Sequence, residues 1–291
     1  MPDTPAPTAP ALSPVTRVAF IGGGNMASAI VGGLIRRGLP ARQIAVVEPL
    51  TDARAKLAQT HGVIVHEHAG DFLRQADLIV WAVKPQHFRD AAAPVRPHAG
   101  GALHLSIMAG IRLADIAAAV SADIAATPGA TRIVRAMPNT PALIGQGITG
   151  LYAAPGVSAA DRAQAEAVIR ATGDALWVAE ESLLDAVTAL SGSGPAYVFY
   201  VLEAMQAAGV ELGLAPEQAR QLAQATFAGS AALASQSDEP LATLRERVTS
   251  KGGTTHAALT ALDGAGVQPA FIRALHAAAT RARELGDAFG A

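Results

Sequence analysis

The segment Ile21–Ile30, with the sequence IGGGNMASAI, decides the fold of the N-terminal half of this chain. It follows an apolar strand pattern over Val15–Phe20 and opens a helical pattern. The spacing Gly22-x-Gly24-x-x-Ala27 matches the dinucleotide-binding fingerprint, in which glycines let the backbone approach a pyrophosphate. A strand–helix turn without a ligand is the alternative. The strand before the motif and the helix after it favour the fingerprint.

An acidic residue, Glu48, ends the next predicted strand, which carries the sequence IAVV. A carboxylate at this position usually accepts a hydrogen bond from the adenosine ribose 2′-hydroxyl and repels a 2′-phosphate. Two alternatives stay open: Glu48 is a solvated residue before Pro49, or Arg54 neutralises a phosphate in spite of it. NADPH and NADH are therefore both candidate cofactors, with a slight preference for NADH.

Short β-branched runs alternate with helical patterns up to about residue 178, which predicts a parallel, doubly wound sheet. The predicted strands are Arg17–Ile21, Ile44–Glu48, Leu78–Val83, Leu103–Ile107, Ile133–Met137, Ile148–Tyr152 and Ala175–Val178. The ligand crevice of such a sheet lies at the carboxyl ends of its strands. Four motif residues come after strands of this pattern: Gly22, Glu48, Lys84 and Asn139.

The strand signal stops after about residue 180 and helical patterns follow to the end. These cover Leu183–Leu190, Ala196–Leu212, Pro216–Ser235, Leu241–Val248, Thr255–Ala261 and Pro269–Phe289. Residues 1–14 contain five prolines, which is typical of a disordered leader. We therefore expect a leader over 1–14, a dinucleotide-binding domain over 15–178 and an all-helical domain over 179–291.

Composition excludes several classes of function. The chain of 291 residues has 16% charged residues and a net charge of −2, without the basic excess of a nucleic-acid-binding protein. It contains no cysteine, which excludes disulfides and thiolate chemistry. The N-terminal segment lacks the pattern of a secretory signal, and no apolar run is long enough to span a membrane. We expect a cytoplasmic protein with no membrane or nucleic-acid partner.

A second motif, VTSKGGTTHAAL, covers Val248–Leu259 and precedes a helical pattern. It places four hydroxyl residues around the pair Gly252–Gly253. Backbone N–H groups at a helix N-terminus favour an anion, and neighbouring hydroxyls can donate to a carboxylate. The simpler interpretation is a Ser/Thr N-cap after a turn.

The eight histidines predict no metal site. His66 and His68 would share one face of a strand, but no third ligand follows at a useful spacing. His256 is explained equally well by helix packing. Glu180, Glu181 and Asp185 are typical of a solvated first helical turn, where acidic residues suit the helix dipole.

Two further motifs are AVKP at Ala82–Pro85 and RAMPNTPA at Arg135–Ala142, and a third, SGSGPAY, covers Ser191–Tyr197. Together with the glycine loop and TSKGGTT, they resemble the pyrroline-5-carboxylate reductases, in the order and spacing of that family. The resemblance extends from about Val15 to the end. It implies a Rossmann-type N-terminal domain and an all-α C-terminal dimerisation domain.

The resemblance also implies the reaction. A hydride passes from NADPH or NADH to the C=N carbon of 1-pyrroline-5-carboxylate and gives L-proline, in the final step of proline biosynthesis. The cofactor would be bound by Gly22, Gly24, Asn25, Met26, Glu48, Ala82, Val83, Lys84, Pro85 and Asn139. The partners would be this substrate and a second copy of the chain, as a homodimer or a higher oligomer built from dimers.

The resemblance assigns substrate binding to the TSKGGTT loop, Thr249–Thr255. This loop would lie beside the nicotinamide that is bound to its own chain or to the partner chain. Thr255 is the catalytic candidate, because it would hydrogen-bond near the ring nitrogen. The substrate would be bound by Ser250, Gly252, Gly253, Thr254 and Thr255. Lys251 departs from the proline common in relatives, and we expect it to point to water.

Two rival functions stay open. Another imine or β-hydroxyacid reductase could share this architecture, but the latter would use a lysine on the first helix of the second domain. The segment SGSGPAYVFYVLEA has no lysine, which argues against it. The other rival is a regulator that binds NAD(P) without catalysis.

Overall fold

The computed structural model describes residues 12–13, 16–121 and 132–290. Its contacts divide the chain into two compact units. The sheet unit contains the chain up to Gly192 and returns from Ala278 onward, and the helical unit is Ser193–Ala277. The leader expected over residues 1–14 lies outside the described residues apart from 12 and 13.

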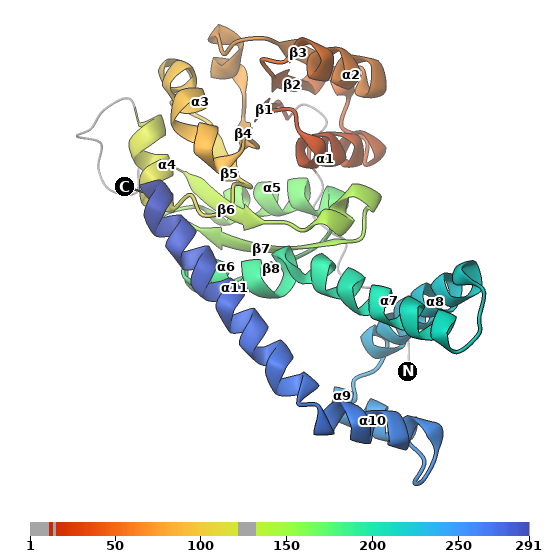
Figure 1. Cartoon of the computed structure of the whole chain (residues 1–291). Helices are drawn as coiled ribbons and strands as arrows, with labels where there is room; N and C mark the ends of the chain where they lie inside the picture. The colour runs from red at the N-terminus through yellow and green to blue at the C-terminus, as the bar shows by residue number, and fades with distance from the viewer. Residues whose placement is uncertain (1–11, 14–15, 122–131, 291) are drawn as a thin grey trace, which may run out of the picture. The chain divides into compact units, whose positions relative to one another are not determined.

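The described residues of the sheet unit form one sheet of eight strands, in the order β3-β2-β1-β4-β5-β6-β7-β8 (Figure 1). The strands are β1 (Val18–Ile21), β2 (Ile44–Val47), β3 (Ile64–His66), β4 (Leu78–Trp81), β5 (Leu103–Ser106), β6 (Ile133–Met137), β7 (Gly147–Ala153) and β8 (Gly173–Trp177). The sheet is parallel-dominated, as expected. The sequence missed β3, a three-residue edge strand that is only partly buried.

One strand pair departs from the parallel pattern. Strands β6 and β7 are antiparallel, with Arg135 opposite Tyr152. A parallel connection needs a crossover of a dozen or more residues, usually helical. Only a short loop joins Met137 to Gly147, and it contains the 3₁₀ turn Thr140–Ile144. The chain therefore reverses direction in this loop, which contains the MPNTP segment Met137–Pro141.

Helices cover both faces of this sheet. They are α1 (Asn25–Arg36), α2 (Thr51–His61), α3 (Phe88–Val95), α4 (Leu113–Val120), α5 (Ala159–Ile169) and α6 (Leu183–Val187). Helix α1 packs against α2 and α5, and α3 packs against α4 on the opposite side of the strands (Figure 1). The core between them is apolar, and strands β1 and β4 are buried along their whole length.

The helical unit contains most of the remaining helices. They are α7 (Gly194–Glu211), α8 (Pro216–Ser235), α9 (Leu241–Arg247), α10 (Thr254–Gly264) and α11 (Val267–Gly290), the last of which ends in the sheet unit. Within the helical unit α7 packs along α8. Residues 179–192, which the sequence assigned to the helical domain, group with the sheet, because α6 contacts β6 and β7. Among the described helices, none is both long and apolar enough to cross a membrane.

Candidate active site

The carboxyl ends of β1, β2 and β4 are tied together by backbone hydrogen bonds. The N–H of Gly22 donates to the Val47 carbonyl at 2.9 Å, and the N–H of Ala82 donates to the Ile21 carbonyl at 2.8 Å. These bonds continue the parallel ladders one residue beyond the strands. The structure therefore brings the glycine loop, the end of β2 and the AVKP motif to one edge of the sheet.

Gly22 is the residue that lets this edge close. Its φ is +96°, in the region that favours glycine. A Cβ at this position would lie 2.7 Å from the Ala82 carbonyl oxygen and 2.9 Å from its carbon. No side chain fits there without moving the backbone of one strand or the other.

Gly24 serves the opposite purpose, because it leaves space open. It is the N-cap of α1, and a Cβ there would meet nothing within 4 Å. The first hydrogen bond of the helix runs from Ser28 N to Gly24 O, so the N–H groups of the first turn lack a helical partner. An exposed helix N-terminus with free N–H donors fits a dinucleotide pyrophosphate. Asn25 is exposed in this turn and Met26 is half-buried.

Glu48 is buried, with 8% of its surface exposed, so it is not a solvated residue before Pro49. One carboxylate oxygen accepts a hydrogen bond from Gly23 N and the other from Leu50 N, each at 2.9 Å. The carboxylate therefore joins the glycine loop to the β2–α2 loop.

The other residues expected to bind the cofactor lie around the same edge. Ala82 and Val83 are half-buried, Lys84 is exposed, and Pro85 begins a 3₁₀ turn. Asn139 is buried after β6, and its Oδ1 accepts from Ile148 N at 3.0 Å. This hydrogen bond holds the first residues of β7 in place, which is a structural role that the sequence did not suggest.

The SGSG and MPNTP motifs also meet, which the sequence did not predict. Thr188–Gly192 form a π-helical turn, a rare conformation found frequently at functional sites. A Cβ on Gly192 would lie 2.7 Å from Met137 Cε, so this glycine packs directly on the methionine that begins MPNTP. The π turn therefore supports the loop after β6.

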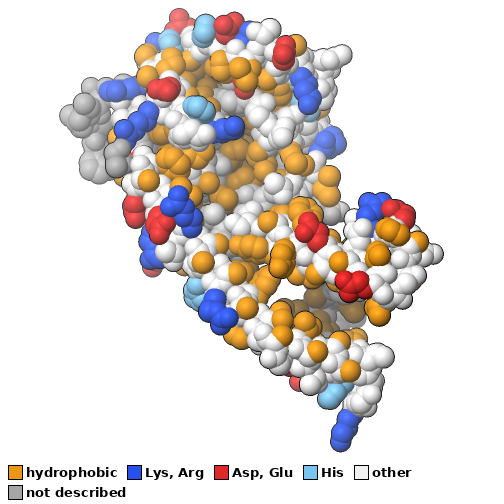
Figure 2. Space-filling view, in the orientation of Figure 1, with side chains coloured by type: hydrophobic (Ala, Val, Ile, Leu, Met, Phe, Trp, Pro, Cys, Tyr) orange, Lys and Arg blue, Asp and Glu red, His pale blue; other side chains and the backbone are white. Residues whose placement is uncertain are grey.

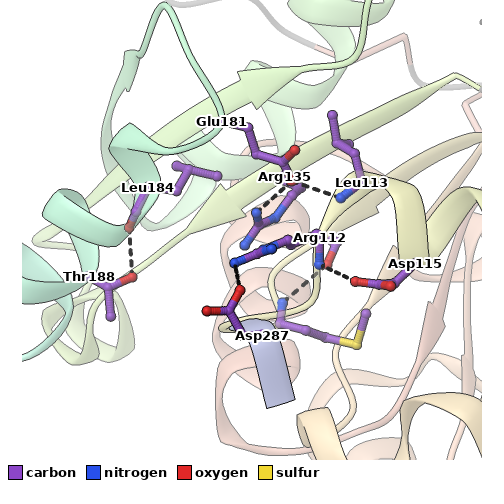
Figure 3. Close-up of polar contacts among 10 residues, drawn as sticks. Arg112, Leu113, Asp115, Arg135, Glu181, Leu184, Thr188 and Asp287 are labelled. Carbon is purple, nitrogen blue, oxygen red and sulfur yellow. Dashed lines mark hydrogen bonds and ion pairs between the residues drawn. The ribbon is translucent and has the colours of Figure 1, made fainter. Parts of the chain in front are cut away.

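A charged cluster lies beside β6 (Figure 3). Buried Arg135 donates from Nη1 to Glu181 Oε1 at 2.7 Å, and the same oxygen accepts from Leu113 N at 2.7 Å. Nearby, Arg112 pairs with Asp287 of α11 at 2.5 Å. Glu181 therefore joins β6 to the N-terminus of α4, and it is not the solvated helix-start residue that we expected. Arg135 within the apolar run IVRAM was the available signal, since a buried arginine needs a partner.

The TSKGGTT loop belongs to the helical unit and is described within it. Gly252 has a φ of +74°, and Gly253 N donates to Ser250 O at 3.0 Å, which closes a turn before α10. Gly253 is the N-cap, with no side-chain capping bond. The simpler interpretation, a Ser/Thr N-cap, is therefore wrong. Within the described residues, no hydrogen bond occupies the hydroxyls of Ser250, Thr254 or Thr255.

The described residues include a histidine in the core of the sheet unit, His104. In the described part of the chain, no three His, Cys, Asp or Glu side chains are grouped to hold a metal ion. His104 lies inside the core, where Trp81 Nε1 donates to its Nδ1 at 3.0 Å. Burial lowers the pKa of His104 to about 4, so the ring is neutral at physiological pH.

The sheet and its glycine edge are of the dinucleotide-binding type, and the match of residues 17–110 to a family model of NADP oxidoreductases places the chain among the NAD(P)H-dependent oxidoreductases. Known proteins narrow this class. A pyrroline-5-carboxylate reductase from Pseudomonas aeruginosa is 43% identical over 279 residues, which cover 94% of this chain and 98% of that protein. The chain therefore belongs to the pyrroline-5-carboxylate reductase family, as the motifs predicted.

Other comparisons agree with this family. Residues 181–285 match the family model described as pyrroline-5-carboxylate reductase dimerisation, and residues 17–110 match NADP oxidoreductase coenzyme F420-dependent. The structure of a pyrroline-5-carboxylate reductase from Coxiella burnetii is 37% identical, with a TM-score of 0.86 over 93% of this chain and 98% of that one. A Plasmodium falciparum pyrroline carboxylate reductase with NADP bound is 26% identical, with a TM-score of 0.81 over 93% and 98%.

Proposed function

We propose that the chain reduces 1-pyrroline-5-carboxylate to L-proline, the final step of proline biosynthesis, with NADPH or NADH as hydride donor. The hydride adds to the C=N carbon of the protonated imine. The C=N double bond becomes a C–N single bond, its electron pair returns to nitrogen, and the nicotinamide is oxidised. The family membership supports this reaction.

The sheet unit would hold the dinucleotide. Free N–H groups at the start of α1 would hydrogen-bond the pyrophosphate, with Gly22 and Gly24 keeping the approach open. The AVKP segment lies beside this loop, and the loop after β6 is supported by the π turn. The bound nicotinamide would supply the hydride.

The start of α10 would hold the substrate, and its glycine N-cap is the observation that carries this assignment. Because Gly253 caps the helix, the nearby hydroxyls are not used in capping. Ser250 and the N–H groups of Gly252, Gly253 and Thr254 would bind the substrate carboxylate. Thr255 is half-buried in the first turn of α10, and its hydroxyl would donate a hydrogen bond near the ring nitrogen of the substrate. Lys251 is exposed, and we assign it no contact.

No general acid with a shifted pKa is needed in this scheme. The iminium form of the substrate already carries its proton, so the protein has chiefly to align the carbon acceptor with the hydride donor. Holding the two reactants in a near-attack geometry of about 3–3.5 Å supplies much of such a rate enhancement.

We also propose that the chain acts as a homodimer, with higher oligomers built from dimers, in the cytoplasm. The helical unit exposes large apolar side chains, including Phe199 at 60%, Tyr200 at 75% and Leu212 at 85%. Figure 2 shows hydrophobic side chains on the visible face of the helices of this unit. Exposed apolar surface of this extent is typical of an interaction face. Light scattering at assay concentration should give twice the mass of the chain or a multiple of it. A fully active monomer would reject the dimer.

The reaction is tested by giving the purified protein 1-pyrroline-5-carboxylate with NADH or NADPH. We expect nicotinamide absorbance to fall and an equal amount of L-proline to form. Binding of the dinucleotide without formation of proline would reject the assignment of the α10 loop and favour a regulator.

A further inference from the structure

We propose that Glu48 and Arg54 make this chain selective for NADH over NADPH. The inference rests on the proposed use of a nicotinamide dinucleotide and concerns only its adenosine end. It departs from what the names of relatives suggest, since one matched family model is described as an NADP oxidoreductase and one relative was solved with NADP bound.

The first step is the fixed position of the Glu48 carboxylate. Its two oxygens accept from the backbone N–H groups of Gly23 and Leu50, at 2.9 Å each, and the residue is buried. A carboxylate oxygen has more than one lone pair, so each oxygen can accept a further hydrogen bond. A ribose 2′-hydroxyl has a hydrogen to donate to it. A 2′-phosphate instead brings a second negative charge to a site with little water to screen it.

The packing around Glu48 keeps the carboxylate at the glycine loop. A Cβ on Gly23 would lie 3.2 Å from Glu48 Cβ and 2.4 Å from Leu57 Cδ1. The glycine loop, the glutamate stem and α2 are thus in close contact. Rotation of the Glu48 side chain away from a phosphate would break both backbone hydrogen bonds.

The second step is that Arg54 is already engaged, although it is the cation best placed by sequence to neutralise a 2′-phosphate. Its Nη1 donates to the carbonyls of Glu48 at 2.9 Å and Pro49 at 2.6 Å. Its Nη2 donates to Glu67 Oε2 at 2.9 Å and to Thr51 Oγ1 at 3.3 Å.

These bonds make Arg54 a clamp on the β2–α2 loop. Its side chain is only 15% exposed. These bonds use both N–H groups of Nη1 and both of Nη2, so a phosphate that bound either nitrogen would displace a loop carbonyl, Thr51 or Glu67. The same contacts that hold the loop therefore pair the Arg54 charge with the Glu67 carboxylate instead of with a 2′-phosphate. Arg54 acts through the loop, so we class it as a positioning residue.

The test is direct binding in the absence of substrate. Dissociation constants for NADH and NADPH are measured by titration of nicotinamide fluorescence, and those for NAD⁺ and NADP⁺ by calorimetry. We expect the 2′-phosphate to weaken binding at least tenfold in both pairs. Equal or tighter binding of NADPH overturns the proposal. Because no turnover is involved, this failure is distinguishable from failure to form proline.

Three variants separate the two residues. Glu48→Gln should reduce the ratio of the NADPH dissociation constant to the NADH dissociation constant at least fivefold. Asp52→Asn removes the same charge from an exposed carboxylate on α2 and should leave this ratio unchanged. Arg54→Met should weaken both dinucleotides alike, since it loosens the loop. A selective loss of NADPH binding in Arg54→Met would show that Arg54 is a phosphate ligand and would refute the proposal. Thermal melts check that each variant is folded, and the Arg54 result stands if Glu48→Gln does not fold.

Discussion

Replacing Gly22 by alanine adds a single methyl group at the point where the sheet edge is tightest. The new Cβ would lie 2.7 Å from the Ala82 carbonyl oxygen, well inside van der Waals contact. The neighbouring atoms are backbone of the segment after β4, which cannot rotate aside as a side chain would. The φ of +96° adds strain of its own, because residues with a Cβ rarely adopt it.

The expected cost is the sum of two effects. A non-glycine residue held in a sparsely populated backbone region costs about 1–3 kcal/mol. Forcing an extra carbon into a packed site typically costs about 1–3 kcal/mol more. Gly22→Ala should therefore lower the free energy of unfolding of the sheet unit by about 2–6 kcal/mol. It should also displace the first turn of α1 and weaken dinucleotide binding at least tenfold.

Gly24→Ala is the matched control, two residues away in the same loop. Its backbone is extended and a Cβ there meets nothing within 4 Å, so stability should change by about 1 kcal/mol or less. Dinucleotide binding should still weaken, because the methyl group occupies the approach to the helix N-terminus. Urea unfolding followed by tryptophan fluorescence measures stability, and NADH titration measures binding. Equal losses of stability in the two variants, or a Gly22→Ala protein as stable as wild type, would refute this reasoning.

Two further predictions follow from the site and the core. Thr255→Val keeps the shape of the side chain but removes its hydroxyl, so kcat should fall at least tenfold while the NADH dissociation constant stays within twofold; unchanged turnover would exclude the proposed role. Because burial lowers the pKa of His104 to about 4 from a usual 6.5, the unfolded chain binds a proton first as the pH falls. The stability that the neutral ring contributes is present above pH 6.5 and is lost towards pH 4, by up to about 3 kcal/mol at 1.36 kcal/mol per pH unit. His104→Asn should remove this part of the pH dependence in urea unfolding, and identical pH profiles for variant and wild type would contradict the assignment.

The sequence predicted the elements whose signal is local. The strand–glycine–helix pattern at Gly22 and the helical runs after residue 180 needed only periodicity and turn residues, and their bounds agree with the structure to within a few residues. Strand β3 was missed because three partly buried residues carry almost no pattern. The reversal between β6 and β7 was missed because alternating strands and helices indicate parallel order unless a loop is too short for a crossover.

The sequence could suggest candidate site residues but not the contacts that these residues make. The motifs identified Glu48 and Asn139, yet no sequence pattern shows that Glu48 bonds to Gly23 N or that Asn139 Oδ1 accepts from Ile148 N. These bonds join segments that are distant or irregular, so they depend on the tertiary fold. The packing of Gly192 on Met137 is of the same kind. The assignments of the α10 loop residues remain predictions.

The sheet unit is interrupted in the sequence, and this has a consequence for biosynthesis. The chain leaves the unit after Gly192 and returns only at Ala278, where the end of α11 contributes Asp287 to Arg112 and Phe289 to the surface at Gly110. On the ribosome, these last contacts form only after the whole helical unit has been synthesised. The nascent sheet unit must therefore wait for the segment after Ala278 before its surface at α4 is complete, and a chain that stopped before Ala278 would leave that surface exposed.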